Sequence, residues 1–443
     1  MNNLKTYQIF ILFLLLSITL IIFVPMINAS YAYIDDFVML QSNSGALKSI
    51  SLSYVIDTFK NCHEGLYHPL VTLSYSAEVT IFGFFPAMFH FDNILLHLVN
   101  ILLVFLIFFK LSNSFWLSLI ITSLFAIHPT RAEVVCWISA RKDLLCTFFY
   151  LLSVLFYVKT YDNVKIKRYI CLSVIMFLLA CFSKAMAITI PFVLILIDLY
   201  KNTFTKQRIK IYLVYFFLSF IFVLVALNSH YEIEHSRFHF DIFRQTVNFI
   251  NAHFNILFYL DKLLLPINLY CMYPFFYDDF AEMPPYYILY SPAILYILVY
   301  LSYLSLKKTK VFFYGFIFFI LTILPSSNIL PIGDFAVADR YTYIPYLGLF
   351  FIFAKLIIYF YNKYNKLAKT LIIVFLIAIF MVLNYLTYNR VLDWQTNNYS
   401  APKSMIFYEF GIKKVSKAGN NKDLIEQNNN FVKHLGVYKK NKH

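Results

Sequence analysis

The feature that most constrains this chain is a series of long apolar runs spread along nearly its whole length. A helix needs about 20 mostly apolar residues to cross the hydrocarbon core of a bilayer. A helix that is hydrophobic all round must be buried in a large core or in a membrane. We therefore predict an all-α polytopic membrane protein with eleven spans, at residues 8–27, 90–109, 114–128, 144–158, 169–183, 187–200, 211–227, 288–306, 311–324, 343–361 and 370–388.

The composition supports a membrane protein and excludes other classes. Hydrophobic residues make up 60% of the chain and charged residues 14%, whereas soluble domains carry about 25% charged residues. Disordered, fibrous and disulfide-scaffold proteins are excluded by the same figures. The net charge of +14 would indicate nucleic acid in a soluble protein, but in a membrane protein it first indicates topology.

The basic residues predict how the chain is oriented. When the N-terminus is placed inside, the compact basic loops all fall on the inner side, as the positive-inside rule requires. These loops lie at residues 159–168, 201–210, 307–310 and 363–369. The short apolar stretch at 255–265 contains two charged residues, and a further span there would put the later basic loops outside. We interpret it as re-entrant or interfacial.

Both ends of the chain carry an interpretation of their own. The first run resembles a signal peptide, with Lys5 before it and Asn28–Ala32 after it. We interpret it as an uncleaved span, because its removal would destroy the agreement with the charges. We divide the chain into a multi-span membrane domain at 1–389 and a short polar tail at 390–443, which an odd number of spans leaves outside.

The acids and histidines are concentrated on the expected outer side. Apart from Asp162 and Asp198, every acid lies outside or at an outer membrane edge, and His97 is the one histidine within a span. A transporter or flippase of lipid-linked sugar needs polar groups through its spans and repeated halves. Neither is visible, so any chemistry is expected on the outer face.

A pair of carboxylates follows the first span. Adjacent acids such as Asp35 and Asp36 tend to separate their pKa values, which suits a general base and an orienting partner. The alternative is helix capping, for which Asp is a preferred residue. Further along the same outer segment lies Tyr67-His68-Pro69-Leu70.

A second outer segment carries cations between two spans. It contains His128, Arg131 and Glu133, followed by Arg141-Lys142-Asp143. Arg offers a planar fork of donors and Lys a point charge, so the segment suits a phosphate. The alternative is an Arg–Asp pair that closes a short loop. No metal-ligand spacing such as HExxH is present, so we expect no metal and no cofactor, although two acids are able to hold a divalent cation.

Two more cations stand at the mouths of spans. Lys184 lies between two spans, where snorkelling to the interface is the usual explanation. Arg340 stands between Asp339 and Tyr341 at the entrance of a span. This arrangement suits a lipid phosphate, with an interfacial anchor as the alternative.

In their order and spacing, these segments resemble the membrane part of the transmembrane and tetratricopeptide-repeat-containing O-mannosyltransferases and their bacterial homologues, within the C-type glycosyltransferase superfamily. The similarity covers roughly residues 8–400. It is carried by Asp35-Asp36, Tyr67-His68-Pro69-Leu70, Phe89-His90, Asn93–His97, His128-Pro129 through Glu133, Trp137-Ile138, Arg141 with Asp143-Leu144-Leu145, Ser183-Lys184, Leu263–Pro266, Pro325–Asn328, Asp339-Arg340-Tyr341, Arg390 and Trp394.

The resemblance implies a C-type glycosyltransferase fold and an inverting transfer of a sugar, mannose among the choices, from a polyprenyl-phosphate donor. The acceptor is expected to be a hydroxyl of a protein or glycan on the outer face of a bacterial inner membrane. Asp35 would act as the base, with Asp36 orienting either Asp35 or the acceptor. Arg340, Arg141 and Lys184 would bind the phosphate, with His128 and Arg131 as second choices. Glu133, His68, Asp339 and Tyr341 are the further expected substrate contacts.

The chain also departs from this family. His68 stands where the family commonly has Arg, Ala140 where it has Gly, and Ala185 where it has Glu. The repeat array is not expected in this chain, because only residues 390–443 follow the last span. An inactive membrane scaffold that keeps the fold remains an alternative to the enzyme, as does the flippase.

Overall fold

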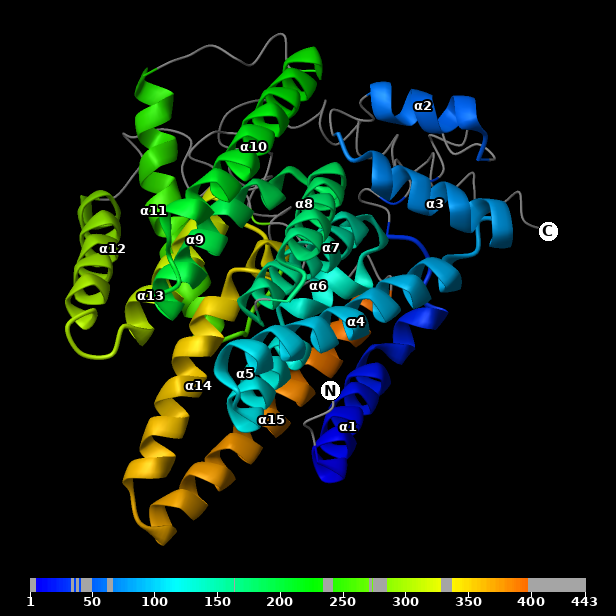
Figure 1. Ribbon diagram of the computed structural model, residues 1–443. Helices are drawn as coiled ribbons and strands as arrows, with labels where there is room; N and C mark the ends of the chain where they lie inside the picture. Colours follow the sequence, from blue (N-terminus) through cyan, green and yellow to red (C-terminus); the bar gives the residue numbers. More distant parts are fainter. Residues whose placement is uncertain are drawn as a thin grey trace.

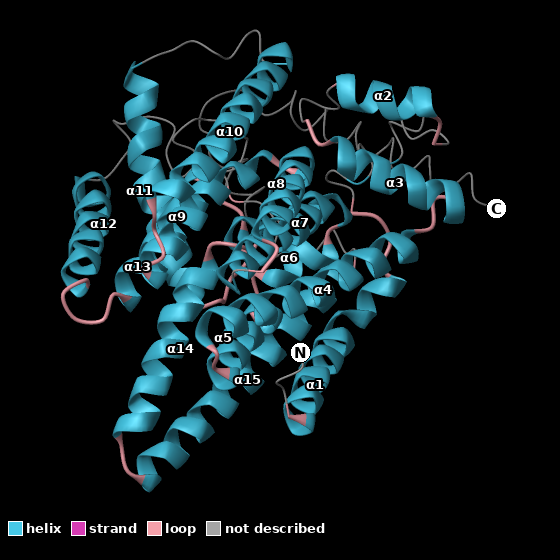
Figure 2. Cartoon of the chain, viewed as in Figure 1, coloured by secondary structure: helices cyan, strands magenta, loops and turns pink. Residues whose placement is uncertain are grey.

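The structure is a computed structural model of the chain. It describes residues 5–32, 36, 40, 50–61, 67–162, 164–233, 242–270, 273, 285–327 and 337–396. Within these ranges the chain is almost wholly helical, as Figure 2 shows. The β structure in the same ranges is one isolated antiparallel bridge between Tyr273 and Val337.

Fifteen α-helices and several short 3-10 turns make up the described fold. The α-helices are α1 Thr6–Phe23, α2 Leu52–Lys60, α3 Pro69–Phe82, α4 Pro86–Ser112, α5 Phe115–Ile127, α6 Arg131–Cys136, α7 Arg141–Lys159, α8 Ile166–Ser183, α9 Ile190–Lys201, α10 Lys206–Ile233, α11 Ile242–Leu264, α12 Pro285–Ser305, α13 Val311–Ile323, α14 Tyr346–Lys363 and α15 Lys366–Gln395. The 3-10 turns are η1 Val24–Asn28, η3 Ile138–Ala140, η4 Thr160–Asp162, η5 Ala185–Thr189, η7 Leu324–Ser326 and η8 Asp339–Thr342.

Eight helical segments in the described ranges are long and apolar enough to cross a membrane. They confirm the prediction of an all-α polytopic membrane protein. The segments are Thr6–Asn28, Pro86–Ser112, Ile138–Asp162, Ile166–Ser183, Lys206–Asn228, Ile288–Ser305, Tyr346–Lys363 and Lys366–Gln395.

The count of eleven spans is not confirmed, because three of the predicted spans are short helices. The runs predicted at 114–128 and 311–324 form α5 and α13, each of 13 residues. The run predicted at 187–200 is divided between η5 and the 12-residue α9. At about 1.5 Å per residue these helices are roughly 20 Å long, against a hydrocarbon core of about 30 Å.

Local sequence explains why these helices are short. Pro191 lies in the first turn of α9, where its missing N–H is not needed, and Asn202 ends the helix with a left-handed φ of 54°. The Ser114 hydroxyl accepts from the N–H of Leu117 and caps the start of α5. At its other end His128 precedes a proline, which disfavours a helical conformation for that residue.

Helix α11 covers the stretch expected to be re-entrant or interfacial. It is 23 residues long and strongly amphipathic, and it is not among the eight segments able to span. Asn248, Asn251 and Asn255 are buried on it at intervals of three and four residues. The re-entrant or interfacial interpretation of this stretch stays a prediction.

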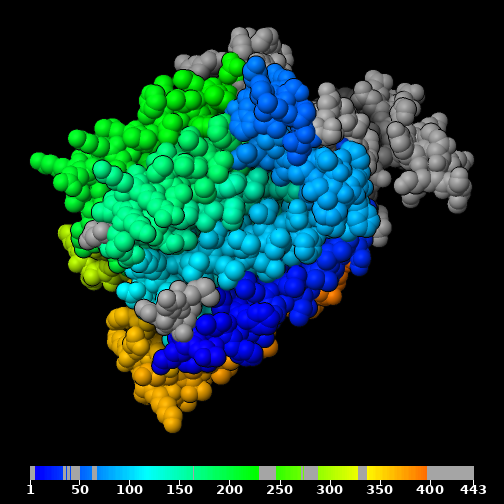
Figure 3. Space-filling view, turned by 45° about the vertical axis from the view of Figure 1, so that its right-hand side comes forward, coloured from blue at the N-terminus to red at the C-terminus, as the bar shows by residue number. Residues whose placement is uncertain are grey.

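The core of the bundle is built from α4, α5, α7 and α8. Helix α7 packs against α8 and α4, and α4 also packs against α5. Helices α14 and α15 form a long hairpin that extends beyond the other helices in Figure 1. Helix α1 packs against α15, and in Figure 3 it runs across the lower part of the surface in dark blue, with α14 and α15 in orange at its edges.

The predicted boundary between membrane domain and tail falls inside a helix. Helix α15 continues past residue 389 and ends at Gln395. Thr387 and Val391 are buried on it, and the Thr387 hydroxyl donates to the carbonyl of Ile127 at 2.5 Å. The start of the predicted tail is therefore part of the packed bundle, and residues 397–443 lie outside the described ranges.

Candidate functional site

The segment between α5 and α7 forms the floor of the site. It runs from the end of α5 through the six-residue helix α6 and the turn η3 into α7. Every residue from His128 to Arg141 is buried. Because the segment is closed in on all sides, its polar side chains must find partners within the protein.

Arg340 is bound to Glu133 at two points. Its backbone N–H donates to Glu133 Oε2 at 2.9 Å, and its Nη1 donates to Oε1 at 2.5 Å. The guanidinium carbon also lies 4.9 Å from the ring centres of Trp137 and Tyr341. Charge-assisted hydrogen bonds of this kind fix both position and orientation. The structure thus brings together three of the predicted residues, Arg340, Glu133 and Tyr341.

Lys184 joins the same cluster from the start of η5. Its Nζ donates to Asp143 Oδ1 at 2.6 Å and lies 5.3 Å from the centre of the Tyr341 ring. The Lys184 side chain is 21% exposed and that of Asp143 is 2% exposed. The charge is therefore held at the edge of the cluster, with one side open. Snorkelling alone does not account for Lys184, since it has a specific buried partner.

Asp339 is a buried carboxyl group beside the Arg340–Glu133 pair. Its Oδ1 accepts from the Tyr273 hydroxyl at 3.0 Å, and its Oδ2 has no hydrogen-bond partner among the described residues. Burial, together with the negative charge of Glu133, raises the pKa of Asp339 to about 8. The group is therefore mostly protonated at neutral pH and is able to donate a hydrogen bond.

Asp36 is fixed by the turn η3. Its Oδ1 accepts from the N–H and hydroxyl of Ser139 at 2.8 and 2.5 Å, and its Oδ2 accepts from the N–H of Ala32 at 2.9 Å. The side chain is fully buried. These bonds tie the end of the first helical segment to the floor of the site. The predicted catalytic partner, Asp35, lies outside the described residues.

Arg141 is enclosed by acceptors from α3 and α4. Its Nη1 donates to Glu78, its Nε to Asn93 Oδ1 at 3.0 Å, and its Nη2 to the carbonyl of Phe89 at 2.8 Å. The guanidinium carbon lies 4.8 Å from the centre of the Tyr75 ring. All three nitrogens therefore have partners within the protein, and the arginine holds α3, α4 and α7 together.

Arg131 is surrounded by rings instead of acids. Its Nη2 donates to the carbonyl of Thr342 at 3.1 Å, while its Nε and Nη1 have no hydrogen-bond partner among the described residues. Burial lowers the pKa of Arg131 to about 10, so it stays charged at neutral pH. Four aromatic rings lie within 6.0 Å of its guanidinium carbon, from Phe125, Tyr343, Tyr346 and Phe350.

The two predicted histidines are buried and lie away from the cluster. His128 contacts the Thr130 hydroxyl at 2.9 Å and the carbonyl of Leu263 at 3.3 Å, which links the end of α5 to α11. His68 is the residue before Pro69 at the start of α3 and is 7% exposed. Neither is placed next to Arg340 or Lys184 by any contact within the described residues.

Sequence reasoning missed three parts of this arrangement. Glu78 and Asn93 had no role assigned to them, because they lie in other segments far from Arg141 in the chain. Arg390 was noticed only through the family resemblance. Its positive charge is near enough to Asp339 to act on the pKa of that carboxyl, and Trp394 lies beside it on the same helix. Asp143 pairs with Lys184, whereas the alternative considered for its segment was an Arg–Asp pair within the loop.

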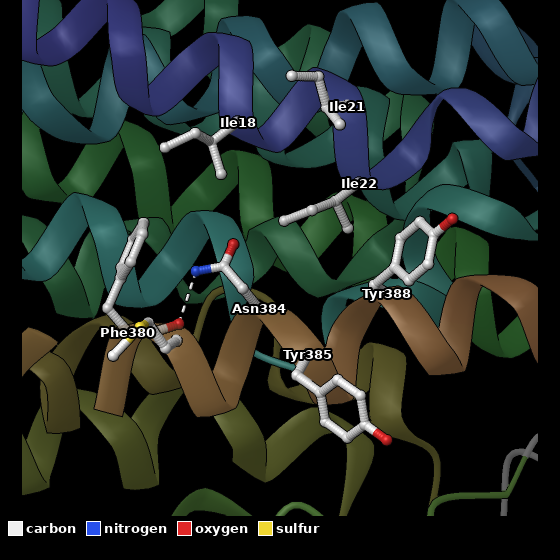
Figure 4. A pocket seen from close by; sticks show the side chains of 8 residues that line it. Ile18, Ile21, Ile22, Phe380, Asn384, Tyr385 and Tyr388 are labelled. Atoms are coloured by element: carbon white, nitrogen blue, oxygen red, sulfur yellow. Dashed lines mark hydrogen bonds between the residues drawn. The ribbon is translucent and has the colours of Figure 1, made fainter. Parts of the chain in front are cut away.

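A groove lies between α1 and α15 on the outside of the bundle. Its volume is about 430 Å³, within the usual range for small-molecule sites. Figure 4 shows the two helices meeting across it. The lining residues are Ile18, Ile21, Ile22, Phe380, Met381, Asn384, Tyr385 and Tyr388. The lining is almost wholly apolar. The amide nitrogen of its one asparagine, Asn384, donates to the carbonyl of Phe380 at 2.6 Å.

The fold and the site together define a class. The chain is an all-helical multi-pass membrane protein with a buried cluster of ion pairs where several helices begin or end. No family model matches the chain, and no solved structure matches it.

The chain is similar to curated proteins that are named protein O-mannosyl-transferase, which confirms the resemblance drawn from the sequence. It is 24% identical over 358 residues to F38B6.6 of Caenorhabditis elegans, covering 76% of this chain and 48% of that protein. It is 37% identical over 109 residues to TMTC4 of Homo sapiens, which is 21% of this chain and 15% of that protein. It is 29% identical over 150 residues to TMTC2 of Homo sapiens, which is 32% of this chain and 18% of that protein. The chain spans about half the length of F38B6.6 in this match.

Proposed function

We propose that this chain is a membrane glycosyltransferase that moves a sugar, mannose in the first instance, from a polyprenyl-phosphate donor to a hydroxyl of a protein or glycan. The observation that carries the proposal is the cluster of Arg340–Glu133 and Lys184–Asp143 in an apolar bundle. The similarity to proteins named protein O-mannosyl-transferase supports it. A lipid-linked donor suits such a site, because its tail stays in the bilayer while its phosphate meets cations.

We place the reaction on the outer face of a bacterial inner membrane. Helix α7 begins at the cluster with Arg141 and ends at Lys159, and α14 begins just after Arg340 and ends at Lys363. The cluster and the basic loops therefore lie at opposite ends of these helices. By the positive-inside rule the basic end faces the cytoplasm.

Asp35 is the proposed general base. The acceptor hydroxyl attacks the anomeric carbon and gives its proton to the carboxylate, while the bond from that carbon to the phosphate oxygen breaks. Single displacement inverts the anomeric configuration. Asp36 is the proposed orienting residue, since the bonds from Ser139 and Ala32 hold its carboxylate in place.

The polyprenyl phosphate leaves with a developing negative charge. Preorganised cations at that oxygen lower the barrier. Arg340 and Lys184 are the proposed cations, because the structure places both beside Tyr341. The isoprenoid tail would lie along the Phe- and Leu-rich spans, and the α1–α15 groove is a described surface of the right character. This scheme requires no metal.

The other predicted site residues have supporting roles in this proposal. Arg141 orders the floor of the site through Glu78, Asn93 and Phe89. Glu133 and Asp339 set the position and charge around Arg340. His128, Arg131 and His68 remain proposed substrate contacts, at a greater remove from the cluster.

An inactive membrane scaffold is the second candidate. It is favoured by one observation, which is that Arg141, Lys184 and Arg340 each already have a carboxylate partner. Such pairs satisfy the charges of these side chains without any substrate. If the chain is an inactive scaffold, substitutions of Asp35 and Arg340 should leave the phenotype unchanged.

The test is transfer by the purified protein. The protein in detergent or nanodiscs would receive radiolabelled polyprenyl-phosphate mannose and a Ser/Thr-rich peptide. We expect transfer by the native chain and a loss of about 100-fold or more in Asp35→Asn and Arg340→Lys, in line with the usual size of acid–base and electrostatic effects. Arg340→Lys keeps the charge, so Glu133 stays paired.

The matched control is Arg168→Lys, at an exposed residue in the first turn of α8. It should keep native activity. Absence of transfer by a folded native protein, together with silent substitutions of Asp35 and Arg340 in cells, would favour the scaffold and overturn the enzyme.

A further inference from the structure

Two tryptophans and two arginines form a continuous stack beside the cluster. The guanidinium of Arg340 lies over the Trp137 ring at 4.9 Å. The rings of Trp137 and Trp394 are stacked, with centres 6.2 Å apart and planes inclined by 26°. The guanidinium of Arg390 lies 5.9 Å from the centre of the Trp394 ring. The stack therefore joins η8, the segment between α6 and η3, and the end of α15.

The two arginines of this stack differ in their partners. Arg340 is bound by Glu133. For Arg390, Nε and Nη2 are buried and have no hydrogen-bond partner in the part of the chain that the structure describes. Buried guanidinium N–H groups without an acceptor are unusual, because charged donors are the most costly to leave unsatisfied.

The indole groups share this property. The Nε1 atoms of Trp137 and Trp394 are buried, and neither has an acceptor among the described residues. An indole N–H is a donor only, so each requires an acceptor to be satisfied. Trp137 is 2% exposed, which leaves solvent little access to its N–H.

Asp339 adds a further group with an open hydrogen-bonding position. Its Oδ2 is buried without a partner among the described residues. Because the pKa of Asp339 is raised to about 8, its carboxyl is mostly protonated at neutral pH and donates instead of repelling an anion. Arg390 and Trp394 are both partly exposed, so a ligand has access to this side.

We propose that Arg390, with the indole N–H groups of Trp137 and Trp394, forms a binding site for a phosphate monoester. A tetrahedral oxyanion offers several acceptors to one cation and several donors, and guanidinium is well matched to it. The phosphate belongs either to a lipid headgroup or to free phosphate. The inference rests on the proposed function, in which the polyprenyl phosphate that leaves after transfer is a lipid phosphate monoester.

Tryptophan fluorescence tests the proposal directly. The chain has three tryptophans, and Trp116→Phe removes the exposed one on α5, so that emission comes only from the stack. The purified protein in detergent would be titrated with farnesyl phosphate, farnesol and inorganic phosphate. We expect a saturable change with farnesyl phosphate and none with farnesol. A matching change with inorganic phosphate assigns the site to free phosphate, whereas its absence assigns the site to the lipid.

Two variants in the Trp116→Phe background identify the residues. Arg390→Gln should weaken farnesyl phosphate binding at least 10-fold, and Trp394→Phe, which keeps a ring but loses the N–H, should weaken it a few-fold. Lys366→Gln, an exposed residue at the other end of α15, is the matched control and should bind like the parent. Each variant is first checked for monodispersity and native thermal unfolding.

The outcomes separate this inference from the proposed function. If farnesyl phosphate binding depends on Arg390 but the protein has no transfer activity, the phosphate site is supported and the proposed glycosyltransferase function is overturned. If the protein has transfer activity but farnesyl phosphate binding is unchanged in both Arg390→Gln and Trp394→Phe, the phosphate site is overturned and the proposed function stands. An equal response to farnesol also overturns it, because binding would then be independent of the phosphate.

Discussion

At the scale of single residues, the buried ion pairs are formed by partners far apart in the chain. Arg141 pairs with Glu78 on α3, and Arg340 pairs with Glu133 on α6. Inside a protein such a pair is weak evidence of added stability, but the removal of one partner leaves an uncompensated charge. Exposed pairs contribute much less. The difference between the two kinds is measurable in this chain.

We expect Arg141→Ala to lower the free energy of unfolding by about 3–5 kcal/mol, because Glu78 loses its buried partner. Lys110→Ala breaks the half-exposed pair with Asp162 and should cost about 0–1 kcal/mol. Thermal unfolding of the two purified variants in the same detergent gives the comparison. Equal losses in stability would contradict the buried role of Arg141.

The raised pKa of Asp339 predicts a pH dependence of stability. Its pKa in the folded protein is about 8, against an ordinary value of 3.8. Between these values the folded state binds more protons than the unfolded state, so the contribution of Asp339 is fully present below about pH 4 and is lost as pH rises to about 8. Above that pH no further loss from this group is expected.

Asp339→Asn removes this titration while keeping the shape of the protonated carboxyl. We expect the variant to gain stability relative to the native protein as the pH is raised from about 5 to about 8. The measurement is the difference in unfolding temperature at the two pH values. Parallel changes in both proteins would show that Asp339 does not titrate in this range.

Residue types in the sequence pointed to the segments that form the cluster but not to the partners within it. The cations at Arg340 and Lys184 and the acid at Glu133 were predicted as site residues from their place at the ends of apolar runs. The pairing of Arg340 with Glu133 was not predictable, because 207 residues separate them. The Arg–Asp pair that the sequence left open as an alternative is not formed by Asp143, which pairs with Lys184 from another segment.

At the scale of elements, two glycines control how α13 packs on α14. A Cβ atom built on Gly315 would lie 2.5 Å from the carbonyl oxygen of Gly348, and one built on Gly348 would lie 2.3 Å from that of Gly315. Both distances are shorter than van der Waals contact. The two helix backbones therefore approach as closely as small residues allow, as is common in membrane bundles.

We expect Gly315→Ala to destabilise the protein by about 1–3 kcal/mol through overpacking. The added methyl would also meet Ile352 at 2.5 Å. The double variant Gly315→Ala, Ile352→Ala relieves only this side-chain clash, so it should not restore stability, because the carbonyl of Gly348 remains. Recovery of native unfolding in the double variant would show that the backbones are not in close contact.

Periodicity of apolar residues predicted the existence of the long helices but not how every run is divided. Pro191, in the first turn of α9, marks the point where the run predicted at 187–200 divides into η5 and α9. The proline is a local signal that is visible in the sequence, but the length of the apolar run by itself predicts a single span. The burial of Asn248, Asn251 and Asn255 on α11 depends on tertiary packing, and no local pattern shows it.

At the scale of the whole molecule, the arrangement of charges predicts the orientation in the membrane. Single cysteines in a cysteine-free background would report it. Lys167→Cys, at an exposed residue in the first turn of α8, and Lys308→Cys, at an exposed residue of the turn after α12, should react with an impermeant maleimide only after permeabilisation. Ser51→Cys, exposed before α2, should react in intact cells. Reaction of the two lysine positions from different sides would contradict the topology.

The fold class was predictable from the sequence because composition alone requires a bilayer. The number of spans was not, because three predicted runs form helices too short for a membrane of ordinary thickness. The site was predictable to the level of its segments. Its groups with open hydrogen-bonding positions, Arg390 and the indoles of Trp137 and Trp394, became visible only when the end of α15 was placed against α6.

The central claim is that this chain attaches a sugar to hydroxyl groups on the outer side of a membrane. Mass spectrometry of surface glycoproteins and glycans tests it most directly, in cells without the chain and in cells complemented with the native chain, Asp35→Asn or Arg168→Lys. We expect a hexose on hydroxyl-bearing residues or sugars to be present with the native chain and with Arg168→Lys, and to be lost without the chain and in Asp35→Asn. Identical glycoconjugates in all four would contradict it.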